Sequence, residues 1–423
     1  MKVSETPGHR LVVVGAGYVG LATAIGFARL GHQIDLIDVN PVVVQRLRQG
    51  GLHFHEPALA EAFSEALAKE RIRVRLGYEE LKSADFAFIC TPTPSAPDGS
   101  LDNSTVYSAV EELLSVLPSE LRIVIRSTLN PGNADAIAEW AEEKWPGVDV
   151  LFNPEFLREG YSLQDFEAPS RVVIGGRNSA AIAAVGEIYA FASDRLIITN
   201  RTSAELIKLG ANAALAVRVS MANEVAHLAN AMGADCETVL AGIGADPRIG
   251  RSYLSPGIGF GGSCLPKDLA SLRTLARGAG VETPVFDGAE RTNEIAIERL
   301  LSRALNVKDN GSQVRVSVLG VAFKSGSDSV RYSRSILLIR RLLSKGIGVS
   351  VFDPLAEASA RRELGDSVTY AGSIEEAMRG SSLAIVVDRG LLPAAEFAGD
   401  HLQVIDGLGR EITRVESALE AAG

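Results

Sequence analysis

A cysteine that follows a run of glycines is the most chemically suggestive feature of the sequence. In SPGIGFGGSCLPKD, residues 255–268, four glycines within 257–262 precede Cys264, and Lys267 and Asp268 follow it. Glycine lets backbone approach a ligand closely, and the thiolate, which nearby cations favour, is the reactive form of cysteine. The pattern predicts a loop that wraps a ligand and a nucleophilic Cys264 with an open thiol.

The other two cysteines are expected to be structural. Cys90 ends an apolar run typical of a buried strand, and Cys236 lies in a helical pattern, where a lone cysteine usually packs as a small apolar residue. The three cysteines have neither the spacing of a disulfide framework nor that of a metal site. We therefore expect no metal and a reducing, cytoplasmic environment.

An amine and an amide lie one helical turn apart in a long helical stretch. Lys208 and Asn212 share a helix face with Glu205, and Asn223 returns to that face further along. Lys208 stands in the otherwise apolar run LIKLGANAAL. A surface lysine extended over apolar neighbours is the alternative interpretation, but the combined pattern favours a functional pair.

Near the N-terminus the sequence has the spacing of a dinucleotide-binding turn. In LVVVGAGYVG an apolar strand runs into Gly15, Gly17 and Gly20, and a helical stretch follows. These glycines permit the tight turn, the approach of a pyrophosphate and close helix–strand packing. Asp38, at the end of the next strand, suits a ribose 2′-hydroxyl, so NAD is predicted rather than NADP. A glycine-rich turn without a ligand is the alternative.

A nucleophilic cysteine in an NAD-binding protein permits more than hydride transfer. Cys264 could capture an aldehyde as a thiohemiacetal, which is oxidised to a thioester and then hydrolysed, while Lys208 and Asn212 stabilise the oxyanion. Two other functions stay open. One is a simple two-electron hydroxyacid dehydrogenase that uses Lys208 and Asn212 with a structural Cys264. The other is an inert NAD-binding redox sensor with an oxidisable Cys264.

The elements that must position these residues follow an α/β pattern. Further apolar strands are expected at 33–40, 85–90, 122–128, 148–156, 171–176 and 195–200. Since they alternate with helical segments, they indicate a parallel doubly wound sheet with ligands at the carboxyl ends of its strands. Thr91, Thr128 and Glu155 come just past such ends.

The second half repeats this architecture after a change of texture. Residues 201–232 contain no proline and one glycine, which predicts a 32-residue helix, and a second α/β pattern begins near residue 314. The predicted fold class is α/β, with two Rossmann-like doubly wound sheets joined by a long central helix and a helical middle domain. Such a long helix is expected to link domains or to cross a subunit interface.

Composition excludes several other classes. The chain has 423 residues and a net charge of −10, with 46% hydrophobic and 22% charged residues. An acidic chain makes nucleic acid an unexpected partner. No apolar run approaches the ~20 residues of a membrane helix, and MKVSETPGHR leads directly into a strand rather than a signal peptide. We expect neither a nucleic-acid nor a membrane partner.

Several motifs resemble the nucleotide-sugar dehydrogenases, the UDP-glucose 6-dehydrogenase and GDP-mannose 6-dehydrogenase group. The motifs are VVGAGYVGLATA (13–24), TPTPSAPDGSLD (91–102), RSTLNPG (126–132), NPEFLREG (153–160), TSAELIKLGANAALAVRVSMANE (202–224), IGADPRIG (243–250), GFGGSCLPKD (259–268) and FKSGSDSVRYS (323–333). The resemblance implies an NAD-dependent, four-electron oxidation of a sugar 6-hydroxymethyl group to a carboxylate. It also implies a role in polysaccharide biosynthesis.

Within that resemblance, catalytic roles carry over residue by residue. Cys264 is the implied nucleophile, and Lys208 and Asn212 stabilise the oxygen of the intermediates. Asp268 and Thr128 hold a water molecule for proton transfer. Glu155 assists the first oxidation or the hydrolysis of the thioester.

The resemblance also implies binding residues and a domain division. The implied cofactor contacts are Gly15, Gly17, Tyr18, Val19, Gly20, Asp38, Thr91, Thr128, Glu159 and Arg331. The implied substrate contacts are Glu155, Phe156, Leu157, Lys208, Asn212, Arg248, Tyr253, Phe260, Gly261 and Lys324. The expected domains are 1–200 for NAD, 201–305 for the cysteine loop and dimer interface, and 306–423 for the nucleotide sugar.

Arg248 matches an arginine that reaches a partner subunit's substrate, which fits a homodimer formed through the 201–232 helix. UDP-glucose, oxidised to UDP-glucuronate, is the expected substrate. GDP-mannose or another nucleotide-diphosphate hexose is the alternative. The C-terminal part departs from the family pattern at Leu408, at Tyr332 and in VDRG, residues 387–390, and whether Arg410 replaces the arginine usual at position 408 stays open.

Overall fold

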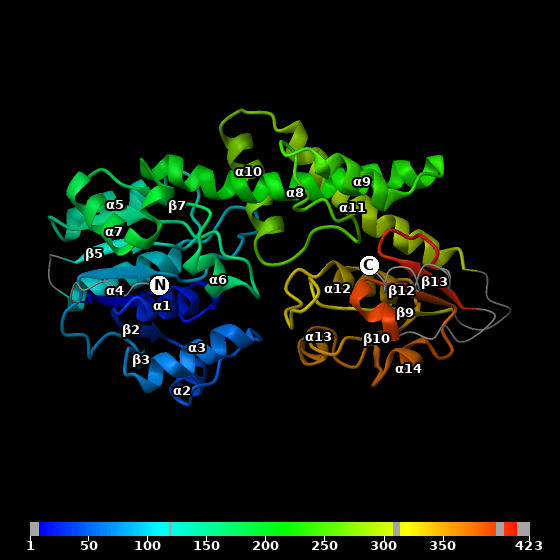
Figure 1. Ribbon diagram of the computed structural model, residues 1–423, viewed down its shortest axis with the longest axis horizontal. Helices are drawn as coiled ribbons and strands as arrows, with labels where there is room; N and C mark the ends of the chain where they lie inside the picture. The colour runs from blue at the N-terminus through cyan, green and yellow to red at the C-terminus, as the bar shows by residue number, and fades with distance from the viewer. Residues whose placement is uncertain (1–7, 118–120, 308–313, 395–401, 413–423) are drawn as a thin grey trace. The chain divides into compact units, whose positions relative to one another are not determined.

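The computed structural model describes residues 8–117, 121–307, 314–394 and 402–412. The chain divides into two compact units (Figure 1). The N-terminal unit comprises Met1–Ala211 and Ala270–Leu275, and the C-terminal unit comprises Asn212–Leu269 and Ala276–Gly423. The three-domain division expected from the sequence stays a prediction.

The N-terminal unit is built on an eight-stranded sheet in the order β3-β2-β1-β4-β5-β6-β7-β8. The strands are β1 (Arg10–Val14), β2 (Gln33–Asp38), β3 (Ile72–Leu76), β4 (Phe86–Ile89), β5 (Arg122–Ile125), β6 (Asp149–Phe152), β7 (Val172–Gly175) and β8 (Leu196–Thr199). From β3 to β6 all neighbours are parallel, and β7 and β8 are parallel to each other.

The expectation of an entirely parallel sheet was wrong at one pairing. β6 and β7 are antiparallel, with Phe152 opposite Gly175. Antiparallel neighbours need no crossover of the sheet, and residues 153–171, which include α6, join these two strands.

Helices cover both faces of this sheet. They are α1 (Tyr18–Arg29), α2 (Pro41–Arg48), α3 (Pro57–Ala68), α4 (Ser104–Val116), α5 (Asn133–Lys144), α6 (Ser162–Glu167) and α7 (Ser179–Ile188), with a 3₁₀ helix η1 (Ala190–Arg195). Along β1, Leu11 and Val13 enter one core with α1, while Val12 and Val14 enter the other with α4. A strand buried on both faces needs a continuous apolar run, which explains LVVV in the sequence.

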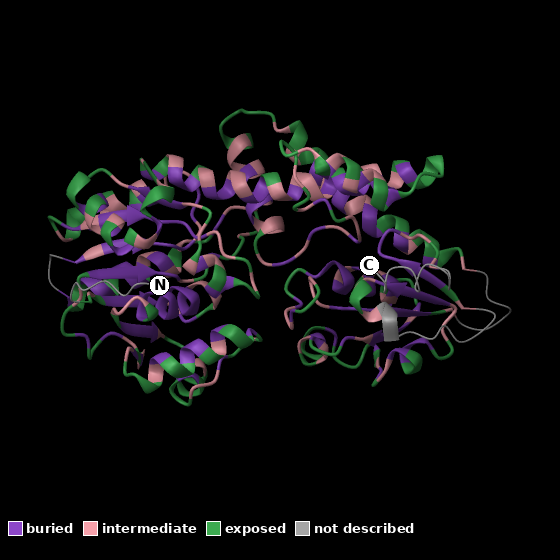
Figure 2. Cartoon of the chain, in the orientation of Figure 1, coloured by how far each residue is buried: buried purple, intermediate pink, exposed green. Residues whose placement is uncertain are grey.

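A 32-residue helix, α8 (Arg201–Met232), occupies the range predicted from the sequence. Buried and exposed positions alternate along its whole length in Figure 2. It is followed by α9 (Cys236–Ala245), α10 (Leu265–Gly278) and α11 (Pro284–Leu305). Asp235 caps α9 by accepting from the N–H groups of Glu237 and Thr238, so α8 and α9 are separate helices.

The C-terminal unit contains a second sheet, in the order β11-β10-β9-β12-β13, with all pairs parallel. Its strands are β9 (Arg315–Leu319), β10 (Gly348–Phe352), β11 (Thr369–Tyr370), β12 (Leu383–Val386) and β13 (Gln403–Asp406), and its helices are α12 (Arg334–Ser344), α13 (Glu357–Leu364), α14 (Ile374–Met378) and the 3₁₀ helix η2 (Arg389–Ala394). The predicted α/β class, with two such sheets and a helical middle region, is confirmed. Within the residues that the structure describes, no helix is long and apolar enough to span a membrane.

Candidate active site

The first glycine-rich turn leaves space for a ligand at one position. Gly15 has φ 93°, and a Cβ there would lie 2.7 Å from the carbonyl oxygen of Cys90. A Cβ at Gly20 would lie 1.8 Å from the oxygen of Gly15. Gly17, in contrast, has no atom within 4 Å of the same point. Gly17 is also the N-cap of α1 and supplies no side-chain cap, so N–H groups of the first turn remain for an anion.

Two polar side chains lie beside this turn, at the carboxyl ends of β2 and β4, the two strands that flank β1. Asp38 accepts from the N–H of Ala16 and of Asn40, each at 2.8 Å. The buried hydroxyl oxygen of Thr91 has no hydrogen-bond partner among the described residues. An open glycine, an uncapped helix start, an oriented carboxylate and an unsatisfied hydroxyl together fit the pyrophosphate and ribose of a dinucleotide.

Glu155 and Lys208 form a buried ion pair within the N-terminal unit. Lys208 Nζ donates to Glu155 Oε1 and to its backbone oxygen, each at 2.8 Å, and the two side chains are only 4% and 7% exposed. Burial opposes ionisation of Glu155, but the charge and hydrogen bond of Lys208, with the N–H of Leu157, outweigh it and lower the pKa of this carboxyl. The lysine that the sequence places in an apolar run is therefore a paired, buried cation.

The aromatic ring of Phe156 lies against two cations. Arg171 Cζ is 3.6 Å from its centroid, and Lys208 Nζ is 5.5 Å away. Such contacts favour a positive charge over a ring face. The segment after β6 therefore contributes both a carboxylate and a ring to the surroundings of Lys208.

Glu205, one turn before Lys208 on the same helix, hydrogen-bonds the start of another helix. Its two carboxylate oxygens accept from the N–H groups of Gly132 and Ala134, each at 2.7 Å, at the start of α5. Burial raises its pKa to about 7. Glu205 thus holds the segment that follows β5 and carries the half-buried Thr128.

The C-terminal unit brings Asn212, Asp268 and Cys264 to the start of α10. Asn212 Nδ2 donates to Asp268 Oδ2 at 2.5 Å, and Lys267 Nζ donates to Asp268 Oδ1 at 2.6 Å. Asp268, fully buried, also donates its backbone N–H to the oxygen of Cys264 at 2.9 Å. Cys264 itself is exposed and directly precedes α10, a position at which a helix N-terminus favours the thiolate.

Three of the four glycines before Cys264 are required by protein neighbours. A Cβ at Gly259 (φ 109°) would lie 2.2 Å from Asn293 Oδ1, one at Gly261 2.6 Å from the oxygen of Tyr332, and one at Gly262 2.7 Å from the ring of Phe323. Gly257 alone among the four has no atom within 4 Å. Close approach to a ligand therefore remains a reason for glycine at 257, whereas protein packing explains the other three.

Two buried asparagines hold this loop, and sequence reasoning missed one of them. Asn223 accepts from the N–H of Gly257 at 2.8 Å. Asn293, on α11, accepts from the N–H of Phe260 at 2.8 Å and donates to its oxygen at 3.1 Å. Asn293 stands in an ordinary helical pattern, RTNEIAIER, and its local spacing carried no signal.

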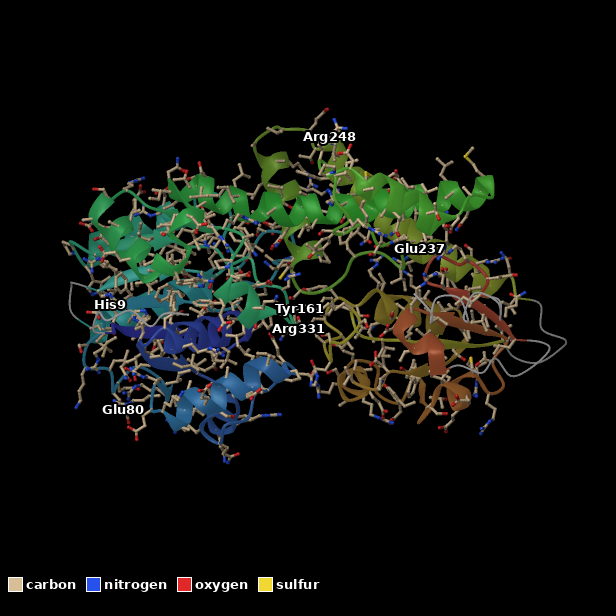
Figure 3. All side chains as sticks on the ribbon, viewed as in Figure 1. His9, Glu80, Tyr161, Glu237, Arg248 and Arg331 are labelled. Carbon is tan, nitrogen blue, oxygen red and sulfur yellow. The ribbon has the colours of Figure 1, made fainter. Side chains whose placement is uncertain are left out.

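Of the predicted residues not yet placed, Tyr18, Val19 and Glu159 lie in the N-terminal unit, and Arg248, Tyr253, Lys324 and Arg331 lie in the C-terminal unit at varied exposure. Tyr253 has a positive φ of 60°, which is unusual for a residue with a side chain. Lys324 Nζ is 5.7 Å from the ring of Phe323. Figure 3 labels the exposed Arg248, which pairs with Asp246 at 2.6 Å, and the exposed Arg331.

The structure also shows what surrounds the departures near the last strand. Leu408 is buried with Ala226 and Leu240 in an apolar cluster formed with α8 and α9. Arg410 turns back onto Asp406, with Nε 2.7 Å from Oδ2, and Arg389 reaches the same oxygen at 3.2 Å. The leucine at 408 thus extends an apolar core, and Arg410 is engaged with a buried carboxylate.

Comparison with known proteins now assigns the class. Residues 9–193 match the NAD binding domain of the UDP-glucose/GDP-mannose dehydrogenase family, 202–295 its central domain and 317–389 its UDP binding domain. The chain belongs to this family, a family of nucleotide-sugar dehydrogenases, and NAD is its cofactor.

Particular relatives are similar over most of their length. UDP-glucose 6-dehydrogenase AglM of Haloferax volcanii is 37% identical over 390 residues, which cover 89% of this chain and 90% of the relative. A UDP-glucose dehydrogenase structure from Pyrobaculum islandicum has a TM-score of 0.89 at 36% identity and covers 95% of both chains. A UDP-D-ManNAc dehydrogenase from Pyrococcus horikoshii has a TM-score of 0.83 at 26% identity, covering 94% of this chain and 95% of that one.

Proposed function

We propose that the protein oxidises UDP-glucose to UDP-glucuronate through a covalent intermediate on Cys264. The observation that carries the proposal is the exposed thiol at the start of α10, next to the buried Asn212–Asp268 pair. The similarity to relatives named as UDP-glucose dehydrogenases supports the choice of sugar nucleotide. When bound, NAD supplies the hydride-accepting chemistry, and oxidation of an alcohol to a carboxylate requires two NAD.

The residues that we propose to hold NAD are those implied by its fingerprint. Gly15 and Gly20 shape the turn, Gly17 gives the pyrophosphate space, and Asp38 and Thr91 offer an acceptor and a hydroxyl to the ribose side. Tyr18, Val19, Thr128, Glu159 and Arg331 complete the proposed cofactor set.

In the first oxidation, Lys208 and Glu155 act on the substrate alcohol. As the C6 carbon loses hydride, its hydroxyl loses a proton, and Lys208 Nζ stabilises the negative oxygen before the aldehyde forms. Glu155 holds the ammonium in place through the contact at 2.8 Å. Thr128 and Asp268 hold the water that carries protons.

In the covalent phase, the thiolate of Cys264 adds to the C6 carbon of the aldehyde, and the former carbonyl oxygen becomes the thiohemiacetal oxygen. Loss of a second hydride and a proton leaves a thioester. Water then adds to its carbonyl carbon, the carbon–sulfur bond breaks, and the thiolate leaves from the carboxylate product. Asn212, oriented by Asp268 at 2.5 Å, donates to the oxygen in these steps.

Substrate selection is proposed to involve the loop before Cys264 and the C-terminal sheet. Phe156, Leu157, Arg248, Tyr253, Phe260, Gly261 and Lys324 form the proposed contacts. Near the last strand, where the chain departs from the family pattern, Leu408 lies in an apolar cluster and Arg410 pairs with Asp406. Sugar nucleotides with a base other than uracil are therefore worth testing. GDP-mannose or another nucleotide-diphosphate hexose is therefore the second candidate.

The decisive experiment measures NADH release and product mass with UDP-, GDP- and dTDP-hexoses. The proposal expects about two NADH for each sugar and a uronate product, with UDP-glucose turned over fastest. One NADH for each sugar would instead identify a two-electron dehydrogenase. A complete lack of turnover with every sugar nucleotide would support an NAD-binding redox sensor.

We also propose a homodimer formed through α8. Leu206, Met221, Leu228 and Met232 are 38–76% exposed on this helix. Met221 and Met232 are 11 residues apart, and Leu206 and Leu228 are separated by twice that spacing. Eleven residues make about three helical turns, so these side chains form a straight apolar stripe. A second copy of the same stripe is a self-complementary partner for it.

A further inference from the structure

Arg126 is a buried cation that the proposed mechanism does not use. It follows β5 directly, and its backbone N–H donates to the oxygen of Ile89 at 2.8 Å, so it lies at the carboxyl ends of β4 and β5. Its exposed fraction is 5%. Charged side chains are almost never buried to this extent unless they are paired.

The direct partners of Arg126 are neutral. Nη1 donates to Asn153 Oδ1 at 2.5 Å and to the hydroxyl of Tyr189 at 2.7 Å. The tyrosine hydroxyl in turn donates to Asn153 Oδ1, and Nε has no hydrogen-bond partner in the described part of the chain. Burial raises the pKa of Tyr189 to about 12, so this phenol stays neutral.

No carboxylate of the described residues forms an ion pair with Arg126. Its charge nevertheless acts on one buried carboxylate, that of Glu155. The segment after β6 gives Asn153 to Arg126 and, two residues later, Glu155 to Lys208. The positive charge of Arg126 contributes, after Lys208, to the lowered pKa of Glu155. One buried cation therefore pairs with Glu155, and a second buried cation hydrogen-bonds the same segment two residues earlier.

Two further titratable groups that interact with Glu155 are neutral. They are Cys90 at the end of β4 and Tyr18 at the start of α1, and burial raises the pKa of both. The N–H of Leu157 is the only further donor to the Glu155 side chain that the hydrogen bonds of the described residues show.

We propose that Arg126 is a positioning residue that acts through Glu155: its fixed buried charge keeps this carboxyl ionised, so that Glu155 can hold Lys208 for the first oxidation. The inference rests on the proposed function of that pair. Burying an arginine against neutral partners is unfavourable. On this proposal, the buried charge serves the function of the site and not the stability of the fold.

The test compares Arg126→Met, which removes the charge, with Arg126→Lys, which keeps it. The matched control is Arg122→Met, at the opposite end of β5, where the guanidinium lies 5.4 Å from the ring of Phe86. The first readout is the pH profile of kcat with saturating substrate. Arg126→Met is expected to move the acid limb upward by about one pH unit, a tenfold change in proton concentration, and to approach the parent rate at high pH.

Arg126→Lys should keep the acid limb near its original position, and Arg122→Met should leave it unchanged. A merely structural role would instead lower activity equally at every pH, without moving the limb, and that result would overturn the proposal. An acid limb that moves equally in Arg122→Met would also overturn it, since any lost charge would then have the same effect.

A second readout does not depend on turnover. The carboxylate infrared band of Glu155, assigned by its loss in Glu155→Gln, is titrated in the parent and in Arg126→Met. Protonation at a higher pH in the variant supports the proposal, and an unchanged titration overturns it. If the parent turns over no sugar nucleotide, the proposed function fails, while this titration still decides the role of Arg126.

Discussion

For Lys208, the sequence suggested a functional role, but only the fold decided which residue it pairs with. Its apolar neighbours and its spacing from Asn212 indicated a functional amine. Its contact at 2.8 Å with Glu155, 53 residues earlier in the chain, could not be read from either feature. At this scale chemistry depends on pairs, and pairs such as Asn212–Asp268 join distant segments.

Cys264→Ser should lower the rate of uronate formation by roughly 10³-fold or more. Serine is a weaker nucleophile than a cysteine thiolate, and an ester is a poorer acyl donor than a thioester. Mass spectrometry of the product and NADH yield measure the effect. Cys236→Ser, a change at a buried cysteine of α9, is the control. Acid production by Cys264→Ser at the parent rate would exclude the covalent mechanism.

Lys208→Met should lower kcat by about 10²-fold, since a methionine cannot stabilise a negative oxygen. The affinity for NAD should change little, because Lys208 belongs to the substrate set rather than to the glycine turn. Steady-state kinetics with calorimetric NAD binding separate the two effects. An unchanged kcat would rule out the oxyanion role.

At the scale of elements, the loop before Cys264 shows why composition alone was ambiguous. A glycine-rich sequence is equally compatible with close approach of a ligand and with tight packing against other parts of the protein. The contacts of Asn293, Tyr332 and Phe323 with this loop assign three of the glycines to packing. The loop is therefore shaped by α11 and by the segment after β9, and Cys264 inherits its position from them.

Gly259→Ala should destabilise the protein by about 2 kcal/mol or more, because it combines a positive φ with a steric overlap. Gly257→Ala, with open space around the added methyl group, should leave the thermal midpoint within a few degrees of the parent but raise KM for the sugar nucleotide. Calorimetry and steady-state kinetics test the pair. Equal losses of stability in both variants would contradict the assignment of Gly259 to packing.

His32, just before β2, predicts a pH-dependent stability of the N-terminal unit. Burial, with the stacked His9, lowers the pKa of His32 to about 4 from 6.5, although Asp85 opposes the shift. The unfolded chain therefore takes up a proton that the folded chain refuses, so this stability is complete above about pH 6.5 and declines as pH falls toward 4.

His32→Gln should flatten the fall of the thermal unfolding midpoint between pH 6.5 and 4, the range set by these two pKa values. His55→Gln, a histidine with an exposed side chain, is the control. Thermal scans at several pH values measure the slope. The prediction fails if the His32→Gln slope equals that of the parent.

At the scale of the whole molecule, the family match, the NAD binding domain and the two sheets define a nucleotide-sugar dehydrogenase. The proposed homodimer is the next level of organisation, and it is open to a direct test. The straight stripe on α8 points to one interface, because apolar side chains exposed in a row on one helix are costly in water.

Leu228→Glu should convert the proposed dimer into a monomer, because the two-fold axis brings the same charge to both sides of the interface. Sedimentation velocity across a range of concentrations measures the mass. Leu305→Glu, at a 52% exposed position at the end of α11, is the control. A parent protein that sediments as a monomer would contradict the proposed interface.

Much of this protein could be predicted from sequence because the relevant signals are local. The strand–glycine–helix turn, the range of α8 and the order of the α/β elements depend on periodicity and on residues near one another. β3 was missed because every predicted strand was a mainly apolar run, whereas IRVRL alternates apolar with charged residues, a pattern typical of a half-buried edge strand. β11 was missed because TY is too short to show a period.

The sequence by itself determined the fold class, the NAD cofactor and the residues that could do chemistry. Only the tertiary structure decided which of them meet: Glu155 with Lys208, Asn212 with Asp268, and Glu205 with the start of α5 rather than with its neighbours on α8. The physical reason is that burial makes an unpaired charge or amide costly, so each such group takes the partner that folding brings to it from a distant segment.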